Sequence, residues 1–261
     1  MNILLLTDFS SNAKYAHRYA IELYKDRPVN IILLHVKKQC LSPNKCSGSC
    51  TATLHQKLNT AANQLFKINS NNQLQTALVE GSFIEEIRSA VIKHNIDLLV
   101  IGAKGATMNT KKAVGNHTKD IASKVKCPAI IVFENSPIEL PKAALFPVNY
   151  TDALYPACLD KLKSIPIWKD LKIKILELKS PTKSKHLMLS SKQILENNLK
   201  QHNVEFLDYT EGVIQLTKEA IKYDLMVFAA KNLSIGNQIF NELDKYMETF
   251  KFKTPLYVLH A

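Results

Sequence analysis

The sequence lacks any apolar stretch long enough to cross a bilayer. A membrane helix needs roughly 18 uninterrupted apolar residues, and no run in the chain approaches that length. Met1-Asn2-Ile3 leads straight into an apolar strand pattern, so we expect no basic, cleavable leader. We therefore expect a cytoplasmic protein with no membrane partner.

Cysteine is also scarce. The chain has five cysteines, an odd number that argues against a disulfide framework. Three of them, Cys40, Cys46 and Cys50, lie close together, and thiolates at short spacings can bind zinc. Their spacing is not one of the familiar zinc patterns, so we interpret the segment as reduced thiols in a loop. Metal binding or redox sensing by these three residues is the alternative.

No dense basic tract accompanies the net charge of +11. Residues 1–140 hold 17 basic and 10 acidic residues, and residues 141–261 hold 17 and 13. Aromatic residues and arginines are not patterned for base stacking. This distribution is typical of a solvated, lysine-rich surface and argues against nucleic acid as a partner.

The familiar catalytic motifs are missing too. The chain has no Gly-x4-Gly-Lys-Ser/Thr loop, no HxGH-like pair and no recognisable Ser/His/Asp arrangement. We therefore expect a protein that is not an enzyme, or one that at most hydrolyses ATP slowly.

Short apolar runs alternate with amphipathic helical patterns in the first half of the chain. Such alternation predicts a mainly parallel sheet with helices on both faces. Five strands are expected, over residues 3–6, 29–36, 74–80, 97–101 and 127–133.

A glycine-bearing turn follows the strand at 97–101. Gly102 and Gly105 allow close approach of a ligand to the backbone, and Gly115 stands where a helix is expected to begin. The positive end of a helix dipole beside open N–H groups is suited to a phosphate. Glycines at strand-to-helix turns also serve packing alone, which is the alternative.

Asp8 follows the first strand. It therefore lies at the carboxyl edge of the sheet, where the crevice of a doubly wound fold opens. Its carboxylate could accept hydrogen bonds from a ribose or help to hold a metal ion. A purely local role in the turn or in helix capping is the alternative.

After a polar, proline-containing linker at 136–142, the pattern starts again. Asp97-Leu98-Leu99-Val100-Ile101 aligns with Asp224-Leu225-Met226-Val227-Phe228 at an offset of 127, and Cys127-Pro128 aligns with Thr254-Pro255 at the same offset. This indicates an internal duplication, with one domain at 1–135 and a second at 143–261.

The second copy has lost the residues that favour an anion. At the same offset Gly102 becomes Ala229 and Gly115 becomes Glu242, while Asp8 corresponds to Asn149. A carboxylate at a phosphate site repels the ligand. We therefore expect the second domain not to bind nucleotide.

The Gly-x2-Gly-x9-Gly spacing with Thr118, the flanking DLLVIG and CPAIIVF segments, and Thr7-Asp8-Phe9-Ser10 resemble the universal stress protein family. The resemblance implies an α/β fold of two tandem Rossmann-like domains, each with a mainly parallel five-stranded sheet and helices on both faces. It also implies an adenine nucleotide, ATP or AMP, with Mg²⁺ accompanying a triphosphate. The implied nucleotide-binding residues are Thr7, Asp8, Val36, Ile101, Gly102, Ala103, Lys104, Gly105, Gly115, Asn116, His117 and Thr118.

The resemblance further implies a regulatory protein of the stress response. By analogy, the last strands at 128–133 and 255–260 would pair the two domains within one chain, and a homodimer is possible. A protein of the same fold that binds partners without nucleotide, and a thiol or metal sensor at the cysteine loop, are the alternative functions.

Overall fold

The computed structural model divides the chain into two compact units. The first unit comprises Met1–Met108 and Gly115–Glu134, and the second comprises Asn109–Val114 and Asn135–Ala261. The structure describes residues 1–38, 48–68, 73–106, 112–148, 159–166, 168–178, 185–200, 204–209, 214–230, 233–245 and 252–260.

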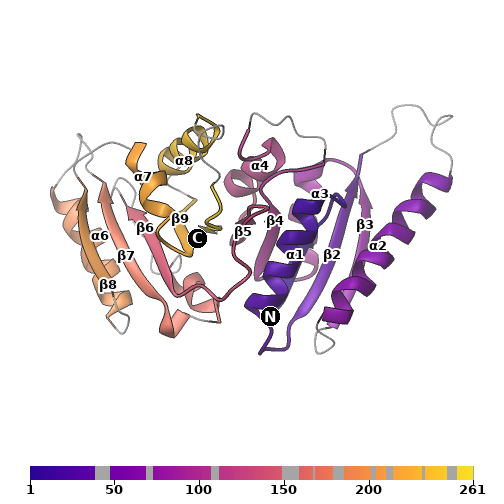
Figure 1. The fold of residues 1–261 in the computed structure, drawn as a ribbon, viewed down its shortest axis with the longest axis horizontal. Helices are drawn as coiled ribbons and strands as arrows, with labels where there is room; N and C mark the ends of the chain where they lie inside the picture. Colours follow the sequence, from indigo (N-terminus) through magenta and orange to yellow (C-terminus); the bar gives the residue numbers. More distant parts are fainter. Residues whose placement is uncertain are drawn as a thin grey trace. The chain divides into compact units, whose positions relative to one another are not determined.

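The first unit is built on a parallel five-stranded sheet (Figure 1). In the order β3-β2-β1-β4-β5, its strands are β3 (Gln73–Glu80), β2 (Asn30–Lys37), β1 (Asn2–Leu6), β4 (Leu98–Gly102) and β5 (Ala129–Val132). Every residue of β4 and β5 is buried, as their continuous apolar sequences predicted. The five expected strands are therefore confirmed.

Four helices described in the first unit cover both faces of its sheet. They are α1 (Ser11–Leu23), α2 (Gly48–Ile68), α3 (Phe83–Lys93) and α4 (Asn116–Lys124). Helix α1 contacts α2, and α3 contacts α4, as right-handed crossovers on either side of a central strand require. Ser10 caps α1, because its hydroxyl oxygen accepts a hydrogen bond from Ala13 N at 3.1 Å.

The second unit repeats this strand order as β8-β7-β6-β9-β10. Its strands are β6 (Ala143–Val148), β7 (Lys172–Leu178), β8 (Val204–Tyr209), β9 (Leu225–Ala229) and β10 (Leu256–Leu259). Its described helices are α6 (Lys185–Leu199), α7 (Ile214–Ala220) and α8 (Leu233–Lys245), with short 3-10 turns η2 (Lys161–Ser164) and η3 (Trp168–Asp170). The expected position of Asn149 lies outside the described residues.

One pair of hydrogen-bonding aspartates shows how closely the two units correspond. Asp97 Oδ2 accepts a hydrogen bond from Asn2 N at 2.8 Å, at the start of β1. Asp224 Oδ2 accepts one from Ala143 N at 3.0 Å, at the start of β6. The offset of 127 that aligned the two aspartates in the sequence therefore aligns them in their hydrogen bonding as well.

The offset fails between the last two strands of each unit. Helix α4 begins at Asn116, well after β4, whereas α8 begins at Leu233, only a few residues after β9. Glu242 therefore lies in the last turn of α8. The prediction that Glu242 takes the place of Gly115 at a helix start is wrong, because α8 begins much sooner after its preceding strand than α4 does.

A histidine is buried in the core of the first unit. His17 on α1 is 2% exposed, and its Nε2 donates a hydrogen bond to Leu6 O at 2.9 Å. Burial lowers the pKa of His17 from 6.5 to about 4, against smaller raising effects of the Leu6 carbonyl and the Asp8 charge. His17 is therefore neutral at physiological pH.

This histidine predicts an acid sensitivity of the first unit. Below pH 6.5 His17 becomes protonated in the unfolded chain, whereas in the folded chain it stays neutral down to about pH 4. The free energy of unfolding therefore falls by up to about 3 kcal/mol between pH 6.5 and 4. His17→Gln, which keeps a donor for Leu6 O, should flatten this dependence. Amide hydrogen exchange of β1 between pH 7.5 and 4.5 measures it, and an unchanged dependence in the variant would contradict the assignment.

A carboxyl group is buried in the second unit. Glu242 is 8% exposed, Thr217 of α7 hydrogen-bonds to it, and its Oε2 has no hydrogen-bond partner. Burial raises the pKa of Glu242 from 4.5 to about 7, although Lys245 and Thr217 oppose the shift. The folded second unit therefore favours the protonated acid.

The second unit should accordingly lose stability as the pH rises. Between pH 4.5 and 7 the folded chain holds a proton that the unfolded chain releases, so the loss is complete above pH 7 and amounts to up to about 3 kcal/mol. Glu242→Gln should be more stable than the parent protein at pH 8 and similar at pH 4.5. Trp168, the single tryptophan, lies in this unit and reports its urea unfolding by fluorescence. Equal pH dependence in the two proteins would refute the assignment.

Candidate functional site

The carboxyl end of β1 and the turn after β4 are joined by Asp8. Its Oδ2 accepts a hydrogen bond from Ala106 N at 2.6 Å, and its Oδ1 accepts one from Ser10 N at 3.0 Å. The structure thus brings Asp8 to the glycine turn, as its place after the first strand predicted. Both carboxylate oxygens are engaged by the main chain of the protein itself.

Asn12, which the sequence reasoning missed, holds the same turn from α1. Its Oδ1 accepts a hydrogen bond from Lys104 N at 2.7 Å, and its Nδ2 donates one to Val132 O at 3.1 Å. The side chain is 4% exposed. Asn12 therefore connects α1, the turn after β4 and the end of β5, and only its polarity on a buried helical face could have signalled this role.

The two glycines of the turn make room for these side chains. A Cβ added at Gly102 would lie 2.8 Å from Asn12 Oδ1, and one at Gly105 would lie 3.0 Å from Asp8 Oδ2. No described glycine has a positive φ, so neither is required by backbone conformation. The sequence predicted that these glycines admit a ligand to the backbone, whereas in the structure the space beside them is taken by Asn12 and Asp8.

Helix α4 begins at the third glycine, as predicted. Gly115 is the N-cap residue with φ −68°, and no side chain of the described residues caps the helix. Its N–H donates to Ala103 O at 2.7 Å, and Thr118 Oγ1 donates to Gly102 O at 3.0 Å, so both residues fix α4 to the end of β4. Asn116 and His117 are exposed. The His117 ring packs edge-on against Phe83 of α3, with ring centroids 4.1 Å apart.

The remaining predicted residues surround this edge of the sheet. Thr7 is buried, its Oγ1 accepts a hydrogen bond from Phe9 N at 3.0 Å, and its carbonyl oxygen accepts one from His35 Nδ1 at 2.7 Å. Val36 is half-buried near the end of β2, and Ile101 is buried in β4. His35, like Asn12, was not among the predicted residues.

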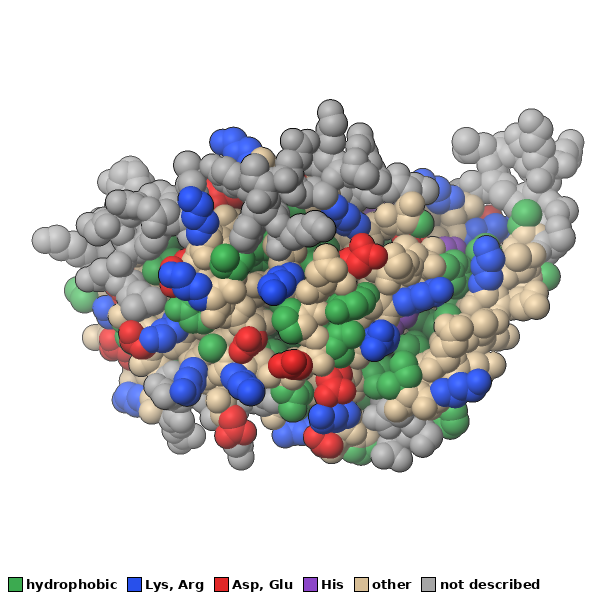
Figure 2. All heavy atoms as spheres, in the orientation of Figure 1, with side chains coloured by type: hydrophobic (Ala, Val, Ile, Leu, Met, Phe, Trp, Pro, Cys, Tyr) green, Lys and Arg blue, Asp and Glu red, His purple; other side chains and the backbone are tan. Residues whose placement is uncertain are grey.

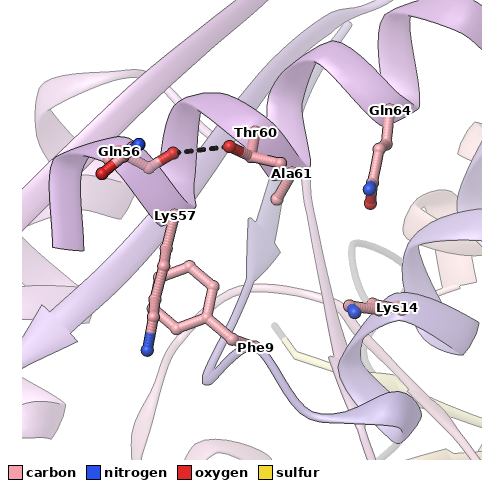
Figure 3. Close-up of a pocket in the computed structure, with 7 residues that line it drawn as sticks. All are labelled: Phe9, Lys14, Gln56, Lys57, Thr60, Ala61 and Gln64. Carbon is pink, nitrogen blue, oxygen red and sulfur yellow. Dashed lines mark hydrogen bonds between the residues drawn. The ribbon is translucent and has the colours of Figure 1, made fainter. Parts of the chain in front are cut away.

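A groove lies between α1 and α2, next to Asp8. It has a volume of about 470 Å³, and Figure 3 shows the Phe9 ring beside the Lys57 side chain, with Lys14 on the neighbouring helix. Phe9 has φ 65°, and its ring stacks at 4.6 Å from that of His35. The full lining comprises Phe9, Lys14, Gln56, Lys57, Thr60, Ala61 and Gln64.

The surface and the metal-binding capacity were also assessed for the described residues. On the face in Figure 2, Lys and Arg side chains are interspersed with acidic and uncharged ones. Within the described ranges no three His, Cys, Asp or Glu side chains gather to hold a metal ion, and no helix is long and apolar enough to span a membrane. Cys50 is exposed, and Cys40 and Cys46 lie outside the described residues.

The chain resembles known proteins both in its sequence and in its structure. The profile of the Universal stress protein family matches residues 1–132. A universal stress protein from Archaeoglobus fulgidus DSM 4304 is similar in structure, with TM-score 0.67 and 14% identity over 98% of this chain and 95% of that chain. A candidate universal stress protein from Pseudomonas aeruginosa UCBPP-PA14 gives TM-score 0.60 and 13% identity over 99% and 92%. No curated protein sequence matches the chain.

These structural similarities cover both units of the chain, whereas the family profile stops at residue 132. At such low identity they show the fold alone. The α/β architecture of two parallel five-stranded sheets, with helices on both faces, is thereby confirmed.

The bridge from Asn12 predicts a coupling to Gly102. Asn12→Ala removes two hydrogen bonds of a buried amide and should cost about 2–3 kcal/mol. Gly102→Ala should cost about 1–3 kcal/mol through overpacking against Asn12. In the double variant the alanine at 102 should cost less, because its nearest neighbour is gone. Hydrogen exchange of the β4 amides measures all three proteins, and additive costs would contradict the predicted coupling.

Proposed function

The chain belongs to the universal stress protein family, and on this premise we propose that its first unit binds an adenine nucleotide and acts as a regulatory module of the stress response. The observation that carries the proposal is the start of α4. This helix begins at a glycine, has no side-chain cap and adjoins the turn after β4. The ligand's phosphates would lie at this helix start, in the crevice at the carboxyl edge of the sheet.

The electrostatics of the helix start support this placement. The first turn of a helix carries roughly half a positive charge and presents main-chain N–H groups outward. Asn116 and His117 in the first turn of α4 are exposed and hence accessible to a ligand. The half-buried Lys104 lies in the turn after β4 and adds positive charge.

The second unit offers no equivalent arrangement in its described residues. Ala229 ends β9 and Ala230 follows it, in place of a glycine turn. Ala230 N donates to Leu259 O at 2.7 Å, as Ala103 N donates to Val132 O at 2.8 Å, so the strand ends match while the turn does not. We therefore propose a single nucleotide site per chain.

ATP and AMP are the proposed ligands. Mg²⁺ usually binds through one or two carboxylates together with phosphate oxygens and water. Asp8 is the carboxylate at this turn, and both of its oxygens already accept main-chain hydrogen bonds. These residues fit a metal that arrives on the triphosphate better than one held beforehand by the protein.

One observation favours a second function. Asp8 and Asn12 already satisfy two N–H groups of the glycine turn. Main-chain donors that the protein's own side chains already satisfy also suit a protein of this fold that binds partners without nucleotide. Pairing of the two domains through their last strands, a homodimer, a cytoplasmic location and a thiol sensor at Cys40, Cys46 and Cys50 all stay predictions.

Substitution at Gly115 tests the proposed site. Its φ of −68° is open to any L-residue, so Gly115→Ala should retain nucleotide binding within a few-fold. Gly115→Glu places a carboxylate at the helix start and should weaken ATP and AMP at least about 100-fold by charge repulsion. Isothermal titration calorimetry measures both. Equal binding by the two variants would place the ligand elsewhere, and no binding by the parent protein would favour the partner-binding function.

A further inference from the structure

We propose that Asp8 competes with anionic ligands, because its carboxylate accepts a hydrogen bond from a main-chain donor of the glycine turn, Ala106 N. The inference rests on the proposed nucleotide site and assigns a residue that sets how much negative charge the site accepts. This role differs from the one that the family resemblance implies, in which Asp8 binds the nucleotide.

The Asp8 carboxylate accepts a main-chain hydrogen bond in the glycine turn, as a bound anion would. Its Oδ2 lies 2.6 Å from Ala106 N, and a hydrogen bond of that length to a charged oxygen is among the stronger kinds. Its Oδ1 is held by Ser10 N at 3.0 Å, which orients the carboxylate toward the turn. The Asp8 side chain thereby connects Ser10, which follows β1, with Ala106, which follows β4.

Gly105 leaves room for the contact between Asp8 and Ala106 N. A Cβ at residue 105 would lie 3.0 Å from Asp8 Oδ2, tighter than an ordinary contact, so the absence of a side chain there lets the carboxylate reach Ala106 N. The group that requires a glycine at residue 105 is therefore the Asp8 carboxylate.

The backbone after Asp8 is also arranged for this conformation. Phe9 adopts φ 65°, an unfavourable value for an aromatic residue. Thr7 Oγ1 accepts a hydrogen bond from Phe9 N at 3.0 Å, and the Phe9 ring stacks on His35 at 4.6 Å. These contacts hold the chain in a sharp turn, from which Asp8 Oδ2 reaches Ala106 N after β4.

The consequence is a preference among ligands. A phosphate near Ala106 N must displace a carboxylate and meet its negative charge, whereas an uncharged nucleoside meets no such repulsion. The site should therefore discriminate against triphosphates, and removal of the Asp8 charge should relax that discrimination.

The test compares Asp8→Asn with the parent protein. Asparagine keeps the shape of the side chain and removes its charge. We expect the variant to bind ATP about tenfold more tightly in calorimetric titrations with EDTA, and to bind adenosine within about twofold of the parent value. Asp26→Asn removes the same charge at an exposed position beyond the end of α1 and should leave both affinities unchanged.

Each outcome decides the matter. Unchanged or weaker binding of ATP by Asp8→Asn, or weaker binding of adenosine, with binding by the parent protein intact, would overturn the competing role and leave the nucleotide site standing. An absence of nucleotide binding in both proteins would overturn the site and the inference together. Amide exchange of Ala106 adds a ligand-free measure, because it should be slow in the parent protein and at least about fivefold faster in Asp8→Asn. Equal exchange rates would show that Asp8 does not occupy this donor.

Discussion

The carboxyl edge of the first unit depends on one constraint. Two side chains, those of Asp8 after β1 and Asn12 in α1, approach the main chain after β4 closely. Lys104 N and Ala106 N both point to oxygens of other segments, Asn12 Oδ1 and Asp8 Oδ2. The half-buried N–H group of Lys104 needs a partner, which Asn12 supplies where a helix or a sheet would use a carbonyl group. The N–H group of Ala106 is exposed and donates to Asp8. The glycines follow from this constraint, since only a residue without a Cβ leaves space for the two oxygens.

The end of β1 is fixed in a complementary way. Its last carbonyl groups, those of Leu6 and Thr7, accept hydrogen bonds from His17 and His35. One histidine comes from α1 and the other from β2, so the strand end is held on both sides. The edge thus combines histidine donors for the carbonyls of β1 with carboxylate and amide acceptors for the N–H groups after β4, and the proposed ligand would enter a network that is already hydrogen-bonded.

The second unit shows how the same sheet can exist without this network. Thr254 Oγ1 donates to Tyr223 O at 3.2 Å where Cys127 Sγ donates to Ile96 O at 3.6 Å, so the amino edge is the same in both units. At the carboxyl edge α8 follows β9 almost directly, and no long glycine turn is needed. The requirements for the fold are therefore met at one edge in both units, whereas the candidate site is confined to the other edge of the first.

The sequence by itself determined the α/β class and the alternation of strands and helices along the chain, because apolar runs and helical periodicity are local properties that each segment carries alone. It also placed Asp8, Gly102 and Gly115 at one edge of the sheet, since parallel strands bring their carboxyl ends together. Only the tertiary structure decided what fills the glycine turn and where Glu242 lies. The hydrogen bonds of Asn12 and the early start of α8 after β9 depend on segments that are distant in the chain, and the spacing of residues does not encode which side chain will pair with a given donor.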